Sequence, residues 1–157
     1  MAKAGSRPHG NTTEVLLVEG DPMNRILFRD LLESVADSVY AAADGPQALE
    51  VLKIVRPDLI VIDVVDPRPS GLDAVKKLAN GAEKKIPVVV VSGLPARVHK
   101  QAMMEAGCDA YVAKPVSVAT FVNTIRHVLA NHRPGRKATS RLAHYLDIGP
   151  SRLNRLS

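Results

Sequence analysis

The chain has 157 residues with a formal net charge of +5, and 46% of its residues are hydrophobic and 24% charged, which is enough for one globular domain with short extensions. Its only cysteine, Cys108, excludes a disulfide framework or a thiolate metal site within one chain. No apolar stretch approaches the roughly 20 residues that span a bilayer, and MAKAGSRPHGNTTE lacks the apolar run of a signal peptide. We therefore expect a cytoplasmic protein without a membrane span.

The positive charge lies at the two ends of the chain. Residues 14–130 carry a net charge of −2, whereas residues 131–157 carry +5 and residues 1–13 carry +2. After Asn131 the composition changes to HRPGRKATSR, which is typical of a linker. The sequence predicts a folded domain over 14–130, a disordered N-terminal extension over 1–13 and a basic C-terminal tail over 131–157.

Short apolar runs rich in β-branched residues alternate with segments whose apolar residues recur at helical spacing. The predicted strands are VLLV at 15–18, SVYAAA at 38–43, LIVI at 59–62, VVVV at 88–91 and AYVA at 110–113. The last predicted helix runs from about Ser117 to Ala130. Its inward face is predicted to comprise Val118, Phe121, Val122, Ile125, Val128 and Leu129. Strands apolar on both faces favour a doubly wound α/β fold with a five-stranded parallel sheet.

Polar residues follow four of the five predicted strands at the point where each strand ends. They are Glu19-Gly20-Asp21, Asp63, Ser92-Gly93 and Lys114-Pro115. In an open parallel sheet, ligands bind beyond the carboxyl ends of the strands. Carboxylates, a hydroxyl and an ammonium at this edge suit a divalent cation such as Mg²⁺ beside an acceptor carboxylate, with groups to hold phosphoryl oxygens.

Four segments resemble the blocks of a CheY-like receiver domain, especially the single-domain receivers of the DivK kind. They are VEGDPMNRILFRDLLE, PDLIVIDVVDPRPSGLDAV, IPVVVVSG and GCDAYVAKPVSVATF. The resemblance covers residues 14–130 and implies a flavodoxin-like fold with strand order 2-1-3-4-5. It also implies a response regulator of bacterial two-component phosphorelay signalling, which acts by protein contact and is not an enzyme. A histidine kinase or phosphotransfer protein would phosphorylate it.

Residue roles follow from the same resemblance, position by position. Asp63 resembles the phospho-accepting aspartate, Ser92 the switch hydroxyl, and Lys114 the lysine of the phosphoryl site. The following Pro115 is typically cis in the family, and Tyr111 occupies the place of its rotating aromatic. The resemblance implies that the surface formed by the fourth helix, fifth strand and fifth helix contacts a downstream protein target.

The implied metal site departs from the family's pattern. Glu19, Asp63 and the backbone carbonyl of Val65 match its ligands. Receivers usually have a second acidic residue after position 19, where this chain has Gly20. Glycine has no side chain to offer a metal, so we expect Mg²⁺ binding to be weakened or lost.

Two nearby aspartates are alternatives at this edge. Asp21 precedes Pro22, which is typical of a helix N-cap, so a cap and a metal ligand both remain open. Asp66 lies in a polar, proline-containing loop and is either a substitute ligand or an exposed residue. Two functions remain open as well: a phosphorylated switch, and a degenerate receiver that acts as a phosphorylation-independent adaptor.

The tail from residue 131 carries six basic residues against one acidic residue. They are Arg133, Arg136, Lys137, Arg141, Arg152 and Arg155, with Asp147 as the acid. Within an otherwise disordered tail, the apolar spacing predicts a short helix near 139–148. Arginines bind phosphates bidentately, and a subgroup of CheY-like receivers binds cyclic di-GMP through an arginine-rich stretch. This resemblance implies cyclic di-GMP as an alternative ligand of Arg133, Arg136 and Arg141. A tail this short predicts no sequence-specific DNA binding.

Overall fold

The computed structural model of the chain describes residues 12–65, 69–81 and 85–132, and helices and strands alternate along this part. The strands are β1 (Glu14–Val18), β2 (Ser38–Ala42), β3 (Leu59–Val64), β4 (Val88–Ser92) and β5 (Ala110–Ala113). The helices are α1 (Pro22–Glu33), α2 (Gly45–Leu52), α3 (Pro69–Asn80), α4 (Ala96–Glu105) and α5 (Val118–His132). Each predicted strand is therefore present.

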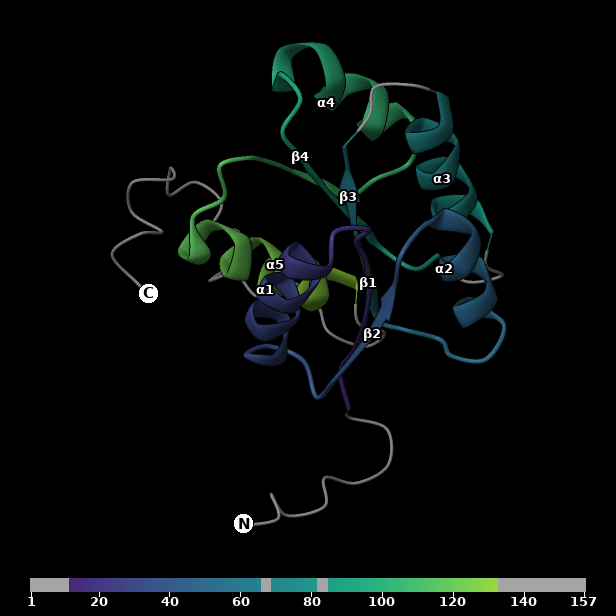
Figure 1. Cartoon of the computed structure of the whole chain (residues 1–157), viewed down its shortest axis with the longest axis vertical. Coiled ribbons are helices and arrows are strands. Elements are labelled where there is room, and N and C mark those ends of the chain that lie inside the picture. Colours follow the sequence, from purple (N-terminus) through teal and green to yellow (C-terminus); the bar gives the residue numbers. More distant parts are fainter. Residues whose placement is uncertain (1–11, 66–68, 82–84, 133–157) are drawn as a thin grey trace.

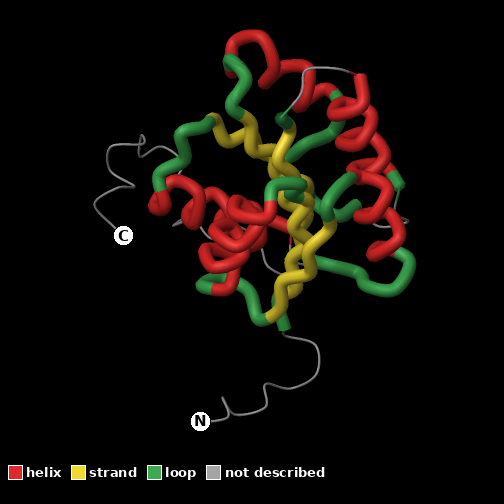
Figure 2. Tube along the Cα trace, viewed as in Figure 1, coloured by secondary structure: helices red, strands yellow, loops and turns green. Residues whose placement is uncertain are grey.

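The strands form one parallel sheet in the order β2-β1-β3-β4-β5, which confirms the predicted fold and strand order. Helices α1 and α5 cover one face of the sheet, and α2, α3 and α4 cover the other (Figures 1 and 2). The strand order places β3 at the centre of the sheet. Whatever follows β3 therefore lies between the loops that follow β1 and β4.

Alternate strand residues serve two separate cores. On β1, Val15 and Leu17 pack with the buried faces of α1 and α5, while Leu16 and Val18 pack with those of α2, α3 and α4. Consecutive strand side chains point to opposite faces, so a strand covered by helices on both sides is apolar throughout. This is the physical reason that short uninterrupted apolar runs predicted the strands correctly.

The structure corrects the prediction for α5. The helix extends from Val118 to His132, two residues beyond the predicted end. Ser117 Oγ accepts the Thr120 N–H at 3.1 Å, so Ser117 precedes the helix and caps its first turn. Val118, predicted to face inward, is 58% exposed, because the buried stripe begins one residue later at Ala119. Of the other predicted inward residues, Val122 is half-buried and the rest are buried.

Three aspartates stand immediately before β2, β3 and β5, at the amino end of the sheet. Each side-chain Oδ2 accepts a backbone N–H from a residue at the start of the neighbouring strand, and each aspartate N–H donates to the carbonyl of that same residue. We call these the amino-end pairs: Asp37 with Thr13, Asp58 with Glu14, and Asp109 with Val88. Thr13, predicted to belong to the disordered extension, is buried and belongs to the first pair.

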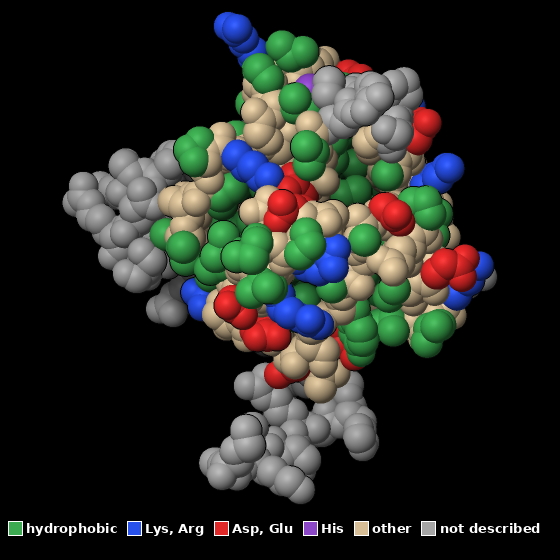
Figure 3. Space-filling model, in the orientation of Figure 1, with side chains coloured by type: hydrophobic (Ala, Val, Ile, Leu, Met, Phe, Trp, Pro, Cys, Tyr) green, Lys and Arg blue, Asp and Glu red, His purple; other side chains and the backbone are tan. Residues whose placement is uncertain are grey.

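The visible surface carries no single dominant charge. On the face in Figure 3, acidic, basic and hydrophobic side chains of the described residues are interspersed. This agrees with the small net charge of residues 14–130. Within the described ranges, no helix combines the length and apolarity that a bilayer crossing requires.

Candidate functional site

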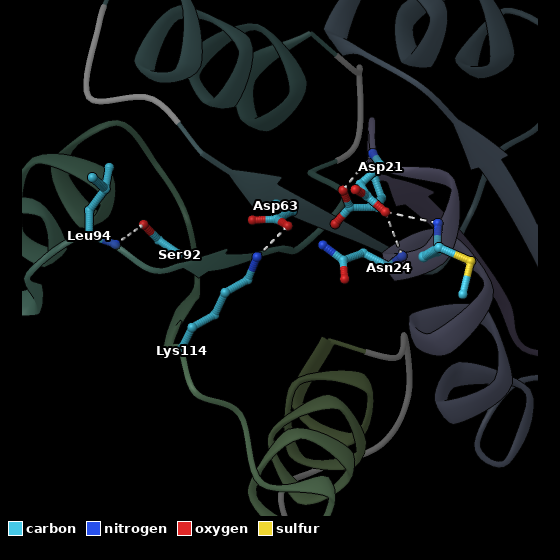
Figure 4. Close-up of polar contacts among 8 residues, drawn as sticks. Asp21, Asn24, Asp63, Ser92, Leu94 and Lys114 are labelled. Carbon is cyan, nitrogen blue, oxygen red and sulfur yellow. Dashed lines mark hydrogen bonds and ion pairs between the residues drawn. The ribbon is translucent and has the colours of Figure 1, made fainter.

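The carboxyl end of the sheet brings together Asp63, Lys114 and Glu19, as the sequence predicts. Asp63 lies near the end of β3, and its side chain is only 2% exposed. The ammonium Nζ of Lys114, which follows β5, lies 2.6 Å from Asp63 Oδ2 (Figure 4). Lys114 is 29% exposed, so the pair has a protein-facing side and an open side. The Lys114–Pro115 peptide bond is cis, as expected from the resemblance.

Glu19 is held in place by the loop that follows β1. Its Oε1 accepts the Asp21 N–H at 2.9 Å, and its side chain is almost completely buried. Arg25 braces the same loop, donating from Nε to the Glu19 carbonyl at 2.9 Å and from Nη2 to the Gly20 carbonyl at 3.3 Å. The orientation of the Glu19 carboxylate is therefore set by backbone contacts.

The pKa of Glu19 is raised from its ordinary 4.5 to about 7, and burial is the largest cause. The neighbouring Asp63 carboxylate contributes to the same shift, because it favours the neutral, protonated form of Glu19. The backbone N–H of Asp21 and the charge of Lys114 act in the opposite direction and lower this pKa. Two facing acids and one nearby ammonium thus make a site whose protonation changes near neutral pH.

Each carboxylate has one oxygen engaged and one buried oxygen without a hydrogen-bond partner. The unpaired atoms are Glu19 Oε2 and Asp63 Oδ1. When both groups are ionised neither can donate to the other, and buried carboxylate oxygens left unpaired are costly. A divalent cation satisfies such oxygens, and Mg²⁺ is commonly held by one or two carboxylates with water completing its shell. The site therefore fits Mg²⁺, although the described residues contain no group of three or more His, Cys, Asp and Glu side chains that could hold a metal ion.

The remaining residues that the sequence offered as metal or nucleotide ligands are not all at this site. Asp21 caps α1, because its Oδ1 accepts the N–H groups of Met23 and Asn24 at 2.8 and 3.0 Å. Of the two readings of Asp21, the cap is the one that the structure shows. Val65 follows β3 directly, and the role of its carbonyl stays a prediction. Asp66 lies outside the described residues, as do Arg133, Arg136 and Arg141, so a nucleotide site in the tail also remains a prediction.

The two predicted switch residues are connected through one backbone position. Ser92 Oγ accepts the Leu94 N–H at 3.1 Å, and the Tyr111 hydroxyl donates to the Leu94 carbonyl at 3.3 Å. Ser92 is buried at the end of β4, whereas Tyr111 on β5 is half-buried. Leu94, in the loop before α4, therefore joins Ser92 to the half-buried Tyr111, and Figure 4 shows its contact with Ser92.

Sequence reasoning missed two residues of this edge, Asn24 and Arg25. Both lie in the first turn of α1, and the Asn24 side chain extends toward Asp63 and Lys114 (Figure 4). Arg25 gives no sequence signal, because its contacts are to backbone carbonyls. The signal for Asn24 is a polar amide four residues after a glycine that replaces a carboxylate.

The fold and this site define a doubly wound α/β domain with a buried acidic pair and a lysine at the carboxyl edge of the sheet. Residues 15–126 match the family model described as the response regulator receiver domain. The chain belongs to this family.

Similar proteins agree with this assignment. The chain is 36% identical to the polar-differentiation response regulator DivK of Brucella anthropi over 118 residues, which are 74% of this chain and 96% of that protein. It is 35% identical to the DivK of Brucella ovis over 121 residues, 76% of this chain and 98% of that protein. Among solved structures, the receiver domain of a Syntrophus aciditrophicus signal transduction histidine kinase matches with TM-score 0.67 and 25% identity, over 81% of this chain and 96% of that one. The chemotaxis response regulator CheY4 of Vibrio cholerae matches with TM-score 0.66 and 26% identity, over 74% and 98%.

Family membership carries general consequences. Receivers belong to two-component signalling proteins, and are not typical enzymes. They generally bind Mg²⁺ and interact with histidine kinases or phosphotransfer proteins and with downstream targets. In this chain Gly20 stands where receivers usually have a second acidic residue, so one side-chain ligand of the family's metal site is missing.

Proposed function

We propose that this protein is a phosphorelay switch that accepts a phosphoryl group on Asp63 from a phosphohistidine of a kinase or phosphotransfer protein. One observation carries the proposal: Asp63 is a buried carboxylate with Oδ2 held 2.6 Å from the Lys114 ammonium and Oδ1 unpaired. An acceptor needs an oriented carboxylate and a nearby positive charge for the incoming phosphoryl oxygens. Asp63 has both, at the edge where such folds bind ligands.

The reaction is an in-line displacement at phosphorus. A carboxylate oxygen of Asp63 forms the new P–O bond while the P–N bond to the donor imidazole breaks, and the departing imidazole takes up a proton. The product is an acyl phosphate on Asp63. Lys114 neutralises phosphoryl charge during transfer. A bound Mg²⁺, held by Glu19 and Asp63, supplies further neutralisation of the phosphoryl oxygens.

An exposed apolar surface beside the site suits the approach of a donor protein. Met23, Ile26 and Leu27 on α1 are all exposed, although large apolar side chains are usually buried. Met23 lies two residues from the Asp21 cap, so this surface starts at the edge of the acidic site. Clustered exposed apolar residues are typical of protein contact sites. We infer that the phosphohistidine donor contacts α1 as it delivers the phosphoryl group.

Phosphorylation changes a different surface. A phosphoryl group on Asp63 draws the Ser92 hydroxyl toward its oxygens, because phosphoryl oxygens are strong acceptors. That movement costs the bond from Leu94 N–H to Ser92 Oγ, and Leu94 also holds the Tyr111 hydroxyl. The surface of α4, β5 and α5 is then remodelled. Exposed Val98 on α4 and Val118 on α5 give this surface apolar contacts for a downstream protein.

Intact mass tests the proposal most directly. The protein is incubated with a small-molecule phosphodonor and Mg²⁺, and the native chain is compared with Asp63→Asn. We expect a phosphoryl adduct on the native chain that is absent from Asp63→Asn and reduced by EDTA. An adduct of equal size on Asp63→Asn would contradict the proposal.

A second candidate is favoured by Gly20, namely a receiver that contacts partners without being phosphorylated. The Gly20→Asp variant discriminates between the two. A Cβ at position 20 would lie 3.2 Å from the Ala43 carbonyl, so Gly20→Ala controls for crowding alone. If only Gly20→Asp is modified, the natural chain is an adaptor whose acidic site has lost its acceptor function.

A further inference from the structure

The acidic site offers two buried carboxylate oxygens to a cation that takes six oxygen ligands. Glu19 Oε2 and Asp63 Oδ1 are its buried unpaired oxygens, and Gly20 contributes no side chain. Mg²⁺ takes six oxygen ligands in nearly octahedral geometry, with waters filling the positions that protein does not. A side-chain oxygen that the fold already holds beside the two carboxylates is a candidate for one of those positions. The nearby side chains therefore decide whether the site retains useful affinity.

Asp21 is not free to supply the missing oxygen. Its Oδ1 accepts two backbone N–H groups of the first turn of α1, and the residue is exposed. Turning the carboxylate toward Asp63 would leave those donors without their cap, at a cost of about 1 kcal/mol. If Asp21 became a metal ligand, it would lose its capping bonds and destabilise α1, the helix that it caps.

Asn24 has no such competing duty. Its backbone N–H takes part in the cap, but no hydrogen bond of its side-chain amide occurs among the described residues. The side chain is half-buried and extends from α1 toward Asp63 and Lys114 (Figure 4). Asparagine is a weak helix former whose usual benefit near a helix start is to cap it, and here Asp21 does that. Stabilisation of α1 therefore does not explain why an asparagine occupies position 24.

We propose that the side-chain carbonyl of Asn24 is an oxygen ligand of the divalent cation and takes over from the carboxylate missing at position 20. The inference rests on the proposed function, in which a cation held by Glu19 and Asp63 assists phosphoryl transfer. Amide oxygens are accepted ligands of hard cations. Rotation about the last side-chain bond exchanges the amide oxygen and nitrogen, so the oxygen can be turned toward the cation without moving α1.

A neutral ligand in place of a carboxylate has a predictable cost. The site then holds two formal negative charges, from Glu19 and Asp63, with Lys114 adjacent. Attraction between charges falls in proportion to the ligand charge, so the affinity for Mg²⁺ is lower than that of a site with three carboxylates. Gly20 and Asn24 together thus describe a weak site that fills only at high free Mg²⁺.

The test is a Mg²⁺ titration of the unphosphorylated full-length chain by isothermal calorimetry. Asn24→Ala should weaken binding about tenfold, the lower end of the range for changes around metal sites. Asn24→Asp should tighten binding above the native level, because it keeps the oxygen and adds a charge. Asn80→Ala is the matched control: Asn80 ends α3, and its side chain binds only the Lys76 carbonyl among the described residues. It should bind like the native chain.

Two results would overturn the inference. One is equal Mg²⁺ affinity in native protein and Asn24→Ala; the other is weaker binding in Asn24→Asp, which would mean that the amide acts as a hydrogen-bond donor. Thermal unfolding without Mg²⁺ checks that each variant is folded. Intact mass separates this outcome from that of the proposed function: a phosphoryl adduct on Asp63 with unchanged Mg²⁺ affinity in Asn24→Ala rejects the ligand and keeps the switch. A native chain that neither binds Mg²⁺ nor forms an adduct rejects both.

Discussion

The two ends of the sheet use acidic residues in opposite ways. At the amino end, each aspartate of the amino-end pairs accepts one backbone N–H and returns another, with all distances between 2.7 and 2.9 Å. At the carboxyl end, Glu19 and Asp63 each keep one buried oxygen without a partner. The first arrangement satisfies the sheet, whereas the second leaves capacity for a ligand.

The difference teaches that an acidic residue beside a strand is not in itself a functional signal. Asp58 immediately precedes β3 and Asp63 is the fifth residue of the same strand, and their partners distinguish them. Buried polar groups are normally satisfied, so two unsatisfied carboxylate oxygens that face each other beside a lysine call for an explanation, and a bound cation is one. The comparison therefore predicts that changes at one end alter stability and changes at the other alter chemistry.

The largest effect should follow a change of the acceptor. Asp63→Asn should abolish the phosphoryl adduct, because an amide is a poor nucleophile and cannot pair with Lys114 as an ion. Asp58→Asn should form the adduct at the native level, since it lies at the other end of β3. Intact mass measures both. An adduct lost equally in the two variants would show that general destabilisation explains the loss.

Changes at the amino end should cost stability. Asp109 accepts the Val88 N–H and lies 3.2 Å from Lys85 Nζ and 3.3 Å from His132 Nε2. Asp109→Ala removes these contacts and should lower the free energy of unfolding by about 2 kcal/mol, as expected when a buried donor loses a charged acceptor. Urea denaturation measures the loss. Asp30→Ala, an exposed change on α1, should stay within about 0.5 kcal/mol of native.

The pH dependence of stability should report the protonation of Glu19. Glu19 has a pKa of about 7 in the folded chain and 4.5 as its ordinary value, so the folded state holds a proton that the unfolded state releases between those values. Without Mg²⁺, the contribution of Glu19 to stability is therefore present below pH 4.5 and lost as the pH rises to about 7. Above pH 7, Glu19→Gln should melt a few degrees higher than native, about 4 °C for each kcal/mol. A melting difference constant from pH 5 to 8 would contradict the raised pKa.

The smallest effect should come from the switch tyrosine. Tyr111→Phe removes only the hydrogen bond to the Leu94 carbonyl, which is long at 3.3 Å, so the loss should be at most about 1 kcal/mol. The adduct on Asp63 should still form, because the tyrosine does not touch the carboxylate. Denaturation and intact mass, measured on the same sample, test both statements. A variant that cannot be phosphorylated would assign Tyr111 to the chemistry.

Sequence patterns predicted most of the fold because its strands are buried on both faces. A short run that is apolar at every position, such as VVVV at 88–91, is typical of a strand that helices cover on both faces. The pair Asp21-Pro22 indicated where α1 begins. The error at Val118 arose because periodicity shows which residues share a helix face but not where the buried stripe begins. Thr13 was missed because its burial depends on Asp37, which is distant in sequence.

The sequence predicted which residues meet at the carboxyl edge of the sheet, because that follows from where each strand ends. It did not predict how their side chains are oriented or paired, because that depends on three-dimensional geometry. Strand ends in a parallel sheet meet at one edge, so Asp63 and Lys114 could be brought together from their positions alone. No pattern shows which carboxylate oxygen remains unpaired, or that Asp21 is committed to a cap. Nor does one show that Asn24 points inward, since that depends on how α1 lies against the sheet.

The chain enters and leaves this fold at the same edge. Thr13 is bound to Asp37 at the start of β1, and His132, at the end of α5, lies against Asp109 at the start of β5. Asp63 is at the opposite end of the strands. Fused proteins, affinity handles or immobilising anchors attached at either junction therefore start from the edge of the sheet that lies away from the acceptor carboxylate. Surface-tethered phosphotransfer assays on this protein should therefore report the same kinetics from either junction.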